Sequence, residues 1–298
     1  MANDSKGTLR RALFFLALLL LPAPGSLEGQ GMAPSYLGET APGAVPVPFA
    51  PHILTRELHS SPVFSKDMGE IFWSEMEGEG IHVMRAREGK WSEAQLAPFS
   101  LPYSGEPTFG AEGNTLYFLS GHEFEGSQSR YDENLWKVVR ERDGWSEPEP
   151  LGPVINDHPM HWGVSFAENG NLYFGRRGEP QSIFVSELRD GVYQDPTPLL
   201  CGGGGAIEGT TPEVASDESW LVFAKGDGVE SETFDLFVIF RTPEGEWTDP
   251  APLDGANTGE MEISPRITPD GLYLFFLRRV AGELRPFWVS SSIIQEAR

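Results

Sequence analysis

Basic residues are scarce in this chain relative to acidic ones, which makes the positions of its arginines informative. The 298 residues include 44 Asp and Glu but only 22 Lys and Arg, for a formal net charge of -22. Beyond the N-terminal segment, two pairs of adjacent arginines nevertheless occur, Arg176 with Arg177 and Arg278 with Arg279. Guanidinium groups bind carboxylates and phosphates through paired hydrogen bonds. One hypothesis is therefore an anionic ligand, such as an acidic sugar or a peptide carboxylate. The alternative is that these arginines only neutralise nearby glutamates.

Two glutamates and two histidines are the other candidates for chemistry. Glycoside cleavage requires two carboxylates at a defined separation, and Glu106 and Glu262 are the pair to test. His59 and His161, together with one of these glutamates, could instead form a metal site of two histidines and one carboxylate. Trp162, which follows His161, is a further ligand-binding candidate.

A calcium site is a second metal alternative. Asp227, Glu230, Glu232 and Asp235 form an acidic segment of the kind that binds calcium through carboxylates. The segment lacks the fixed spacing of a calcium loop, which favours a solvated surface. We therefore predict no resident cofactor and no metal site, with a bound divalent cation as the alternative.

A repeat of about 50 residues determines which strands carry these side chains. Each copy has a first strand, an acidic turn and a second strand that begins with an aliphatic residue. The aliphatic residue follows the acidic one by four positions in all five copies: Asp67 and Ile71, Glu112 and Leu116, Glu168 and Leu172, Asp217 and Leu221, Asp270 and Leu274. This constancy indicates a repeated hairpin.

Two further strands complete each copy. A third strand follows every hairpin, and in the first four copies a fourth strand begins at an aromatic residue: Trp91, Trp145, Tyr193 and Trp247. Each copy is therefore predicted to form a four-stranded antiparallel sheet. The fifth copy ends near Ser292, and residues 45–54 contain a proline-rich stretch similar to the ends of the other fourth strands. Because an open ring would leave sheet edges bare, we predict an all-β, five-bladed β-propeller over residues 45–298, closed by this N-terminal strand.

Strand order also predicts where the candidate residues meet. In such a blade, the start of the innermost strand and the end of the second strand lie on one face, opposite the tight acidic turns. His59, Glu106, His161 and Glu262 precede or begin innermost strands, whereas the arginine pairs end second strands. All of them are therefore expected around one mouth of the central channel, where closed β-folds often bind ligands.

The repeat also resembles that of a known family. Glu106-Pro107-Thr108-Phe109, Leu116-Tyr117-Phe118, Trp145-Ser146-Glu147-Pro148 and Pro269-Asp270-Gly271 are similar to the TolB-type β-propeller repeat of bacterial exported proteins. The resemblance covers about residues 36–292. It implies protein-binding and scaffold roles, with some carbohydrate-active relatives. Residues 65–72 also look like the Asp-box of sialidases, but this match occurs once and the repeat itself explains it.

The N-terminus has the layout of a secretory signal peptide. Lys6, Arg10 and Arg11 precede an apolar run over 12–21, and small residues and prolines follow it. We predict a signal peptide over 1–25, an extension over 26–44, and a periplasmic or secreted protein. The run is about half as long as a membrane helix requires, so we expect no membrane insertion after cleavage; a short uncleaved anchor is the alternative. Cys201, the only cysteine, is interpreted as a passive thiol.

Two classes of function remain. The first is a non-catalytic binding or scaffold module of the cell envelope, whose partner is an envelope or extracellular protein, or an anionic small ligand or saccharide. The second is a carbohydrate-active hydrolase or lyase that uses carboxylates or histidines at the channel mouth. The sequence carries no recognisable catalytic signature, which favours the first. Nucleic acid is excluded because so acidic a chain lacks the basic face that it requires.

Overall fold

The computed structural model describes residues 35–298 apart from 125–132, 179, 227–232 and the side chain of His161. The chain separates into two units, Met1–Gly31 and Met32–Arg298, and the described residues all belong to the second. The predicted signal peptide, the first part of the predicted extension and most of the acidic segment around Glu230 therefore lie outside the described residues.

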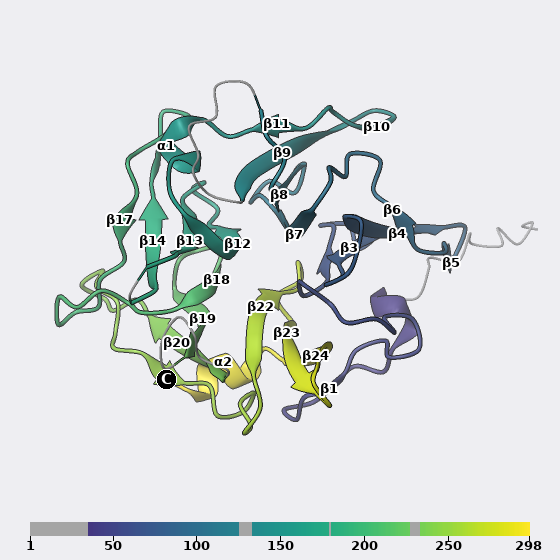
Figure 1. The fold of residues 1–298 in the computed structure, drawn as a ribbon. Helices are drawn as coiled ribbons and strands as arrows, with labels where there is room; N and C mark the ends of the chain where they lie inside the picture. Colours follow the sequence, from purple (N-terminus) through teal and green to yellow (C-terminus); the bar gives the residue numbers. More distant parts are fainter. Residues whose placement is uncertain (1–34, 125–132, 179, 227–232) are drawn as a thin grey trace, which may run out of the picture. The chain divides into compact units, whose positions relative to one another are not determined.

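Five antiparallel sheets are arranged as a five-bladed β-propeller, as predicted (Figure 1). Blade 1 contains β2 (Val63–Phe64), β3 (Glu70–Ser74), β4 (Ile81–Arg87) and β6 (Gln95–Leu96). Blade 2 contains β7 (Ser104–Phe109), β8 (Thr115–Ser120), β9 (Asn134–Glu141) and β11 (Glu149–Pro150). Blade 3 contains β12 (Met160–Phe166), β13 (Leu172–Arg176), β14 (Ser182–Ser186) and β17 (Thr197–Pro198). Blade 4 contains β18 (Thr210–Val214), β19 (Trp220–Gly226), β20 (Phe234–Phe240) and β21 (Ala251–Pro252). Blade 5 contains β22 (Glu262–Ile267), β23 (Tyr273–Val280), β24 (Glu283–Ser290) and β1 (Val47–Pro48).

Short elements extend these blades. Two-residue strands lengthen the outer hairpins of blades 1, 2 and 3: β5 (Lys90–Trp91), β10 (Gly144–Trp145), β15 (Leu188–Arg189) and β16 (Val192–Tyr193). The helical segments are equally short: η1 (Ser35–Gly38), α1 (Pro153–Asn156) and α2 (Ser292–Glu296). The many glycines and prolines of the chain are consistent with this scarcity of helix.

In blades 1, 4 and 5, the acidic residue of the repeat accepts hydrogen bonds that close the turn between the first two strands. In blade 1, the Ser65 hydroxyl and the Gly69 amide both donate to Asp67 Oδ1, at 2.6 and 3.0 Å. In blade 5, Thr268 and the Leu272 amide donate to Asp270 Oδ1 in the same way, at 2.7 and 3.1 Å. Side-chain to backbone bonds of this kind stabilise tight turns, which explains why the acidic residue recurs at a fixed distance from the second strand.

The N-terminal strand closes the ring, as predicted. β1 pairs with β24, placing Val47 opposite Trp288 and Pro48 opposite Phe287, and the Phe49 amide donates to the Pro286 carbonyl at 2.9 Å. The Phe49 side chain is completely buried, with its ring centroid 4.7 Å from that of Phe275 and 6.2 Å from that of Phe64. It therefore joins the last blade to the first.

The innermost strands of blades 2–5 contain β-bulges. The pairing of each with its second strand shifts register in β7, β12, β18 and β22. Within these bulges Glu106, Trp162, Thr211 and Ser264 adopt left-handed backbone conformations, with φ between 47 and 54 degrees. Bulges redirect side chains, and here they bring neighbouring blades into contact: the Ser264 amide donates to Thr211 Oγ1 at 3.3 Å.

Candidate functional site

Glu262 and Arg278 are brought together as a buried ion pair. They face each other across β22 and β23, and Arg278 Nε donates to Glu262 Oε1 at 2.7 Å. The Thr258 hydroxyl donates to the same carboxylate oxygen at 2.6 Å, and Glu262 is completely buried. The Arg278 guanidinium also lies 4.6 Å above the Phe287 ring. For Arg278, this arrangement fits the alternative of charge neutralisation better than that of an anion site.

The other arginines of the two pairs contact groups of their own blades. Arg176 lies 4.9 Å above the Phe184 ring in blade 3, and the Arg177 amide donates to the Pro159 carbonyl at 2.8 Å. In blade 5, Arg279 Nη2 is 3.3 Å from the sulfur of Met261. These contacts do not by themselves join the two pairs into one site.

Trp162 packs between blades, and His161 remains an open candidate. The Trp162 ring is 5.9 Å from that of Phe234 in blade 4 and packs against the largest core cluster. His161 belongs to β12, but its side chain lies outside the described residues. The metal alternative that combines His161 with His59 therefore stays a prediction.

Three buried ionisable side chains and the half-buried His59 form a network at the centre of the propeller, which we call the axial cluster: His59, Glu106, Glu213 and Arg266. Arg266 Nη1 is 3.5 Å from Glu213 Oε2, and Arg266 Nη2 is 3.7 Å from Glu106 Oε2. His59 Nδ1 is 3.5 Å from Glu106 Oε1. Three of the four lie on β7, β18 and β22, the innermost strands of blades 2, 4 and 5 (Figure 1), and His59 just precedes the innermost strand of blade 1. Arg266 therefore links residues that are distant in the sequence.

The sequence analysis expected Glu106 and His59 at the channel mouth and did not single out Glu213 or Arg266. Both directly follow the proline of the repeat, as Pro212-Glu213 and Pro265-Arg266. The equivalent residues in the other blades are Val63, Thr108 and Ser165. A charged residue on an innermost strand of a propeller must be paired, because burial of an isolated charge is costly. That requirement is the signal that could have identified the cluster.

We expect the axial cluster to make the protein more stable at mildly acidic pH. Burial raises the pKa of Glu213 to about 7 from its usual 4.5, although Arg266 opposes the shift, and burial also raises the pKa of Glu106. Between pH 4.5 and pH 7, the folded protein keeps the Glu213 proton, whereas the unfolded chain releases it. The free energy of unfolding therefore falls as the pH rises from 4.5 to 7. Glu213 alone accounts for about 3 kcal/mol of this change. Urea denaturation at pH 5 and pH 8 measures it, and Glu213→Gln should flatten the difference. An unchanged difference in that variant would rule out Glu213 as the cause.

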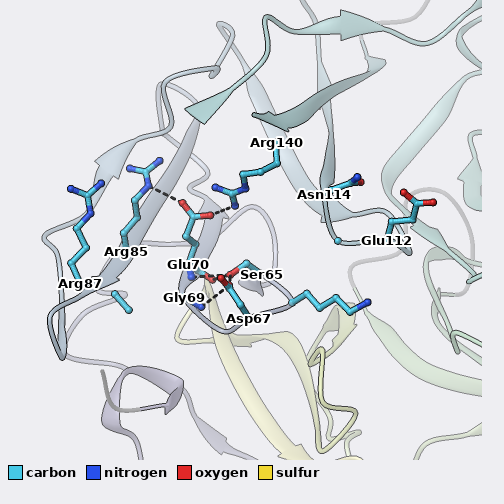
Figure 2. A pocket seen from close by; sticks show the side chains of 12 residues that line it. Ser65, Asp67, Gly69, Glu70, Arg85, Arg87, Glu112, Asn114 and Arg140 are labelled. Carbon is cyan, nitrogen blue, oxygen red and sulfur yellow. Dashed lines mark hydrogen bonds and ion pairs between the residues drawn. The ribbon is translucent and has the colours of Figure 1, made fainter. Parts of the chain in front are cut away.

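A cleft beside the tight acidic turns, on the face opposite the predicted channel mouth, carries a different set of charges (Figure 2). This arginine cleft has a volume of about 680 Å³ and lies between blades 1 and 2. Four basic side chains line it, Lys66, Arg85, Arg87 and Arg140, against three acidic ones, Asp67, Glu70 and Glu112. A local excess of positive charge is notable in a chain with a net charge of -22.

Glu70 fixes the orientation of two of these arginines. It is 8% exposed, accepts from Arg85 Nε at 2.8 Å and forms an ion pair with Arg140 Nη2. Figure 2 shows the two guanidiniums on opposite sides of the Glu70 carboxylate. Arg140 also lies 4.0 Å above the Trp145 ring. Because Arg85 uses only its Nε for Glu70, both of its terminal nitrogens remain able to meet a ligand.

The remaining charges of the cleft are less constrained. Lys66 and Arg87 are exposed and form no ion pair with any residue in the described part of the chain. Hydrogen bonds from Ser65 and the Gly69 amide lower the pKa of Asp67, and the Arg140 charge adds to this. Asp67 is therefore ionised and committed to its turn. The cleft thus combines two oriented guanidiniums with two unpaired cations, an arrangement suited to a carboxylate.

The sequence contained a signal for part of this cleft. Arg140 lies near the end of the third strand of blade 2, five residues before Trp145, and Arg241 directly follows the third strand of blade 4, six residues before Trp247. Arg241 likewise lies above the ring of its tryptophan, at 4.5 Å. A recurring arginine before the fourth-strand tryptophan indicates a packed guanidinium. The sequence analysis instead followed adjacent arginine pairs, which led to the other face.

The described residues contain no group of three or more His, Cys, Asp or Glu side chains arranged to hold a metal ion. Most of the acidic segment around Glu230 is not among them. Cys201 is partly exposed, and its thiol donates to the Gly205 carbonyl at 3.4 Å. Within the same residues, no helix has the length and apolar character needed to cross a membrane.

Comparison with known proteins reveals similarity of fold. No protein-family profile and no curated protein sequence matches the chain. Solved structures that resemble it include TolB from Acinetobacter baumannii, with 12% identity over 78% of this chain and 52% of that chain and a TM-score of 0.49. α-L-arabinofuranosidase from Lactobacillus brevis shares 11% identity over 79% of this chain and 93% of its own, with a TM-score of 0.48. The gluconolactonase XC5397 from Xanthomonas campestris shares 13% identity over 84% of this chain and 96% of its own, with a TM-score of 0.45. The chain thus spans about half the length of that TolB chain, and the names cover different classes of protein.

Proposed function

We propose that this protein is an exported, non-catalytic β-propeller that binds a carboxylate-bearing ligand or partner segment in the arginine cleft. The observation that carries the proposal is the pair of guanidiniums oriented by Glu70, beside two cations, Lys66 and Arg87, that form no ion pair within the described residues. These guanidiniums can donate paired hydrogen bonds to a carboxylate. Because Glu70 and Trp145 already hold them in place, binding would cost little side-chain conformational entropy. The sequence hypothesis was an anionic ligand bound at the channel mouth. The proposal keeps an anionic ligand but assigns it to the arginine cleft on the face with the tight turns.

Burial of the two candidate catalytic carboxylates supports binding over catalysis. Glu262 is completely buried and Glu106 is 2% exposed. Each is also paired with an arginine, Arg278 and Arg266 respectively. A general acid or nucleophile must reach the scissile bond. Carboxylates held in this way fit a structural role, and we therefore prefer the binding module to the carbohydrate-active alternative.

Removal of the unpaired cations should weaken ligand binding without affecting the fold. Lys66→Ala with Arg87→Ala is expected to reduce the affinity for glucuronate, or for an acetylated peptide with one aspartate, by about tenfold or more. The unfolding temperature should not change, because neither side chain is buried or ion-paired within the described residues. Calorimetric titration measures the affinity.

Arg142→Ala is the matched control, because Arg142 is an exposed arginine of the β9–β10 hairpin that does not line the cleft. Affinity should also fall with added salt, since exposed charges are screened. If neither probe binds the unmodified protein, or if binding survives the double substitution unchanged, the cleft is not a carboxylate site.

Export predicts a processed N-terminus. We infer that the segment 1–25 is a signal peptide, because basic residues precede an apolar run of about half a membrane span. N-terminal sequencing of the protein recovered from the periplasm or medium should begin close to residue 26. Recovery in the membrane fraction with the apolar run 12–21 intact would instead support the uncleaved anchor.

A further inference from the structure

A second pocket adjoins the arginine cleft on the turn face, between blades 2 and 3. This pocket, which we call the tyrosine pocket, has a volume of about 260 Å³. Aromatic side chains of both blades line it, namely Tyr117, Phe166 and Tyr193. The Tyr117 and Phe166 ring centroids are 4.2 Å apart, and the hydroxyls of Tyr117 and Tyr193 interact. The three residues are partly exposed, so part of this aromatic surface remains available to a ligand.

The tyrosine pocket has the opposite charge to the cleft. Glu112 and Glu168 line it, and no lysine or arginine is among its described lining residues. Both carboxylates are exposed, and Glu112 forms no ion pair with a described residue. Carboxylates beside aromatic rings favour a cation, which gains from both the charge and the ring quadrupole. A second anionic group would be repelled there.

The two sites share a wall. Glu112 and Asn114, in the turn between β7 and β8, line the arginine cleft and the tyrosine pocket alike. Figure 2 shows both residues at the edge of the cleft beyond Arg140. A ligand that reaches across this turn therefore meets positive charge on one side and negative charge on the other.

We propose that the partner is a bipolar peptide segment, with an acidic residue in the arginine cleft and a lysine or arginine in the tyrosine pocket. This inference rests on the proposed function of the cleft and adds the class and polarity of the partner. A peptide can carry both charges, one for each side of the turn. A saccharide built from one acidic and one neutral sugar would fill the arginine cleft but would bring no cation to Glu112 and Glu168. Charge complementarity therefore favours a peptide. Complementary potentials of this kind determine orientation and specificity more than raw affinity.

The test uses acetylated and amidated peptides of glycine and serine, so that the peptide termini carry no charge. Each contains one aspartate and one lysine separated by one, two or three residues; the comparison peptide has glutamine in place of lysine. Calorimetric titration should show the best-spaced bipolar peptide binding about tenfold more tightly than the aspartate-only peptide, which corresponds to one cation site beside aromatic rings. Glu168→Gln, at a residue that lines the tyrosine pocket but not the arginine cleft, should reduce this preference to about threefold or less while binding of the aspartate-only peptide is retained. Glu244→Gln, an exposed glutamate remote from both sites, is the matched control and should leave the preference intact.

The outcomes separate this inference from the proposed function. If the bipolar and aspartate-only peptides bind equally, and both depend on Arg87, the bipolar partner is wrong and the carboxylate site stands. If a disaccharide of glucuronate and a neutral sugar binds more tightly than every peptide, the peptide class is wrong and the carboxylate site again stands. If neither glucuronate nor any aspartate peptide binds, the proposed function fails and this inference fails with it.

Discussion

Replacing Arg266 by methionine should destabilise the propeller by about 3–5 kcal/mol at pH 8. Arg266 is 3% exposed and lies between Glu106 and Glu213, which are also buried. Methionine retains much of the side-chain volume but leaves two carboxylates in the interior without a cation. Because unpaired buried charge is costly, the loss should exceed that from the volume change alone. Urea denaturation followed by tryptophan fluorescence measures it.

Two controls separate this charge effect from ordinary packing. At pH 5 the destabilisation should shrink, because burial raises the pKa of both glutamates and each can take up a proton. The triple variant Glu106→Gln, Glu213→Gln, Arg266→Met should recover most of the lost stability, because it removes the buried charges together. A loss below about 1 kcal/mol in the single variant at pH 8 would contradict a role for the axial cluster in holding the blades.

Truncating Phe49 to alanine is the second change with a large expected effect, about 3–5 kcal/mol. The ring is completely buried and contacts Phe275 and Trp288 of blade 5 and Phe64 of blade 1. The cavity would lie at the junction that closes the ring. We therefore expect faster amide hydrogen exchange in β24, whose outer edge pairs with β1, in addition to a lower free energy of unfolding.

Val47→Ala provides the comparison on the same strand, because Val47 is 37% exposed. Its removal should cost less than about 1 kcal/mol. Equal destabilisation by the two substitutions, or unaltered exchange in β24 of the Phe49→Ala variant, would show that the N-terminal strand does not secure the ring.

The five-bladed fold could be predicted from the sequence because its information is local and repeated. Asp67 and Asp270 each stabilise a turn through bonds to residues within two positions. The same distance then separates each acidic residue from the strand that follows. The missing fourth strand of the last blade was also predictable, because a bare sheet edge needs a partner and residues 45–54 resemble the ends of the other fourth strands.

For the candidate site, the sequence led to a hypothesis about ligand chemistry but did not identify the cleft. The positions of the few basic residues suggested an anionic ligand, with charge neutralisation as the alternative, and strand order predicted Glu106 and His59 at the channel mouth. The sequence could not reveal that Arg278 is neutralised by Glu262, since this depends on register across β22 and β23. Nor could it show that Arg85 and Arg140, from different blades, are oriented by the same carboxylate of Glu70.

The sequence by itself determined the number of blades, the order of their strands and the closure of the ring. The tertiary structure decided which charges are paired inside and which line a cleft. The physical reason is that a turn or a hairpin is stabilised by residues a few positions apart, whereas the net effect of a charge depends on its burial and on partners from other blades. In this acidic chain the packing of five blades places Arg266 in the interior and leaves Lys66 and Arg87 beside a cleft.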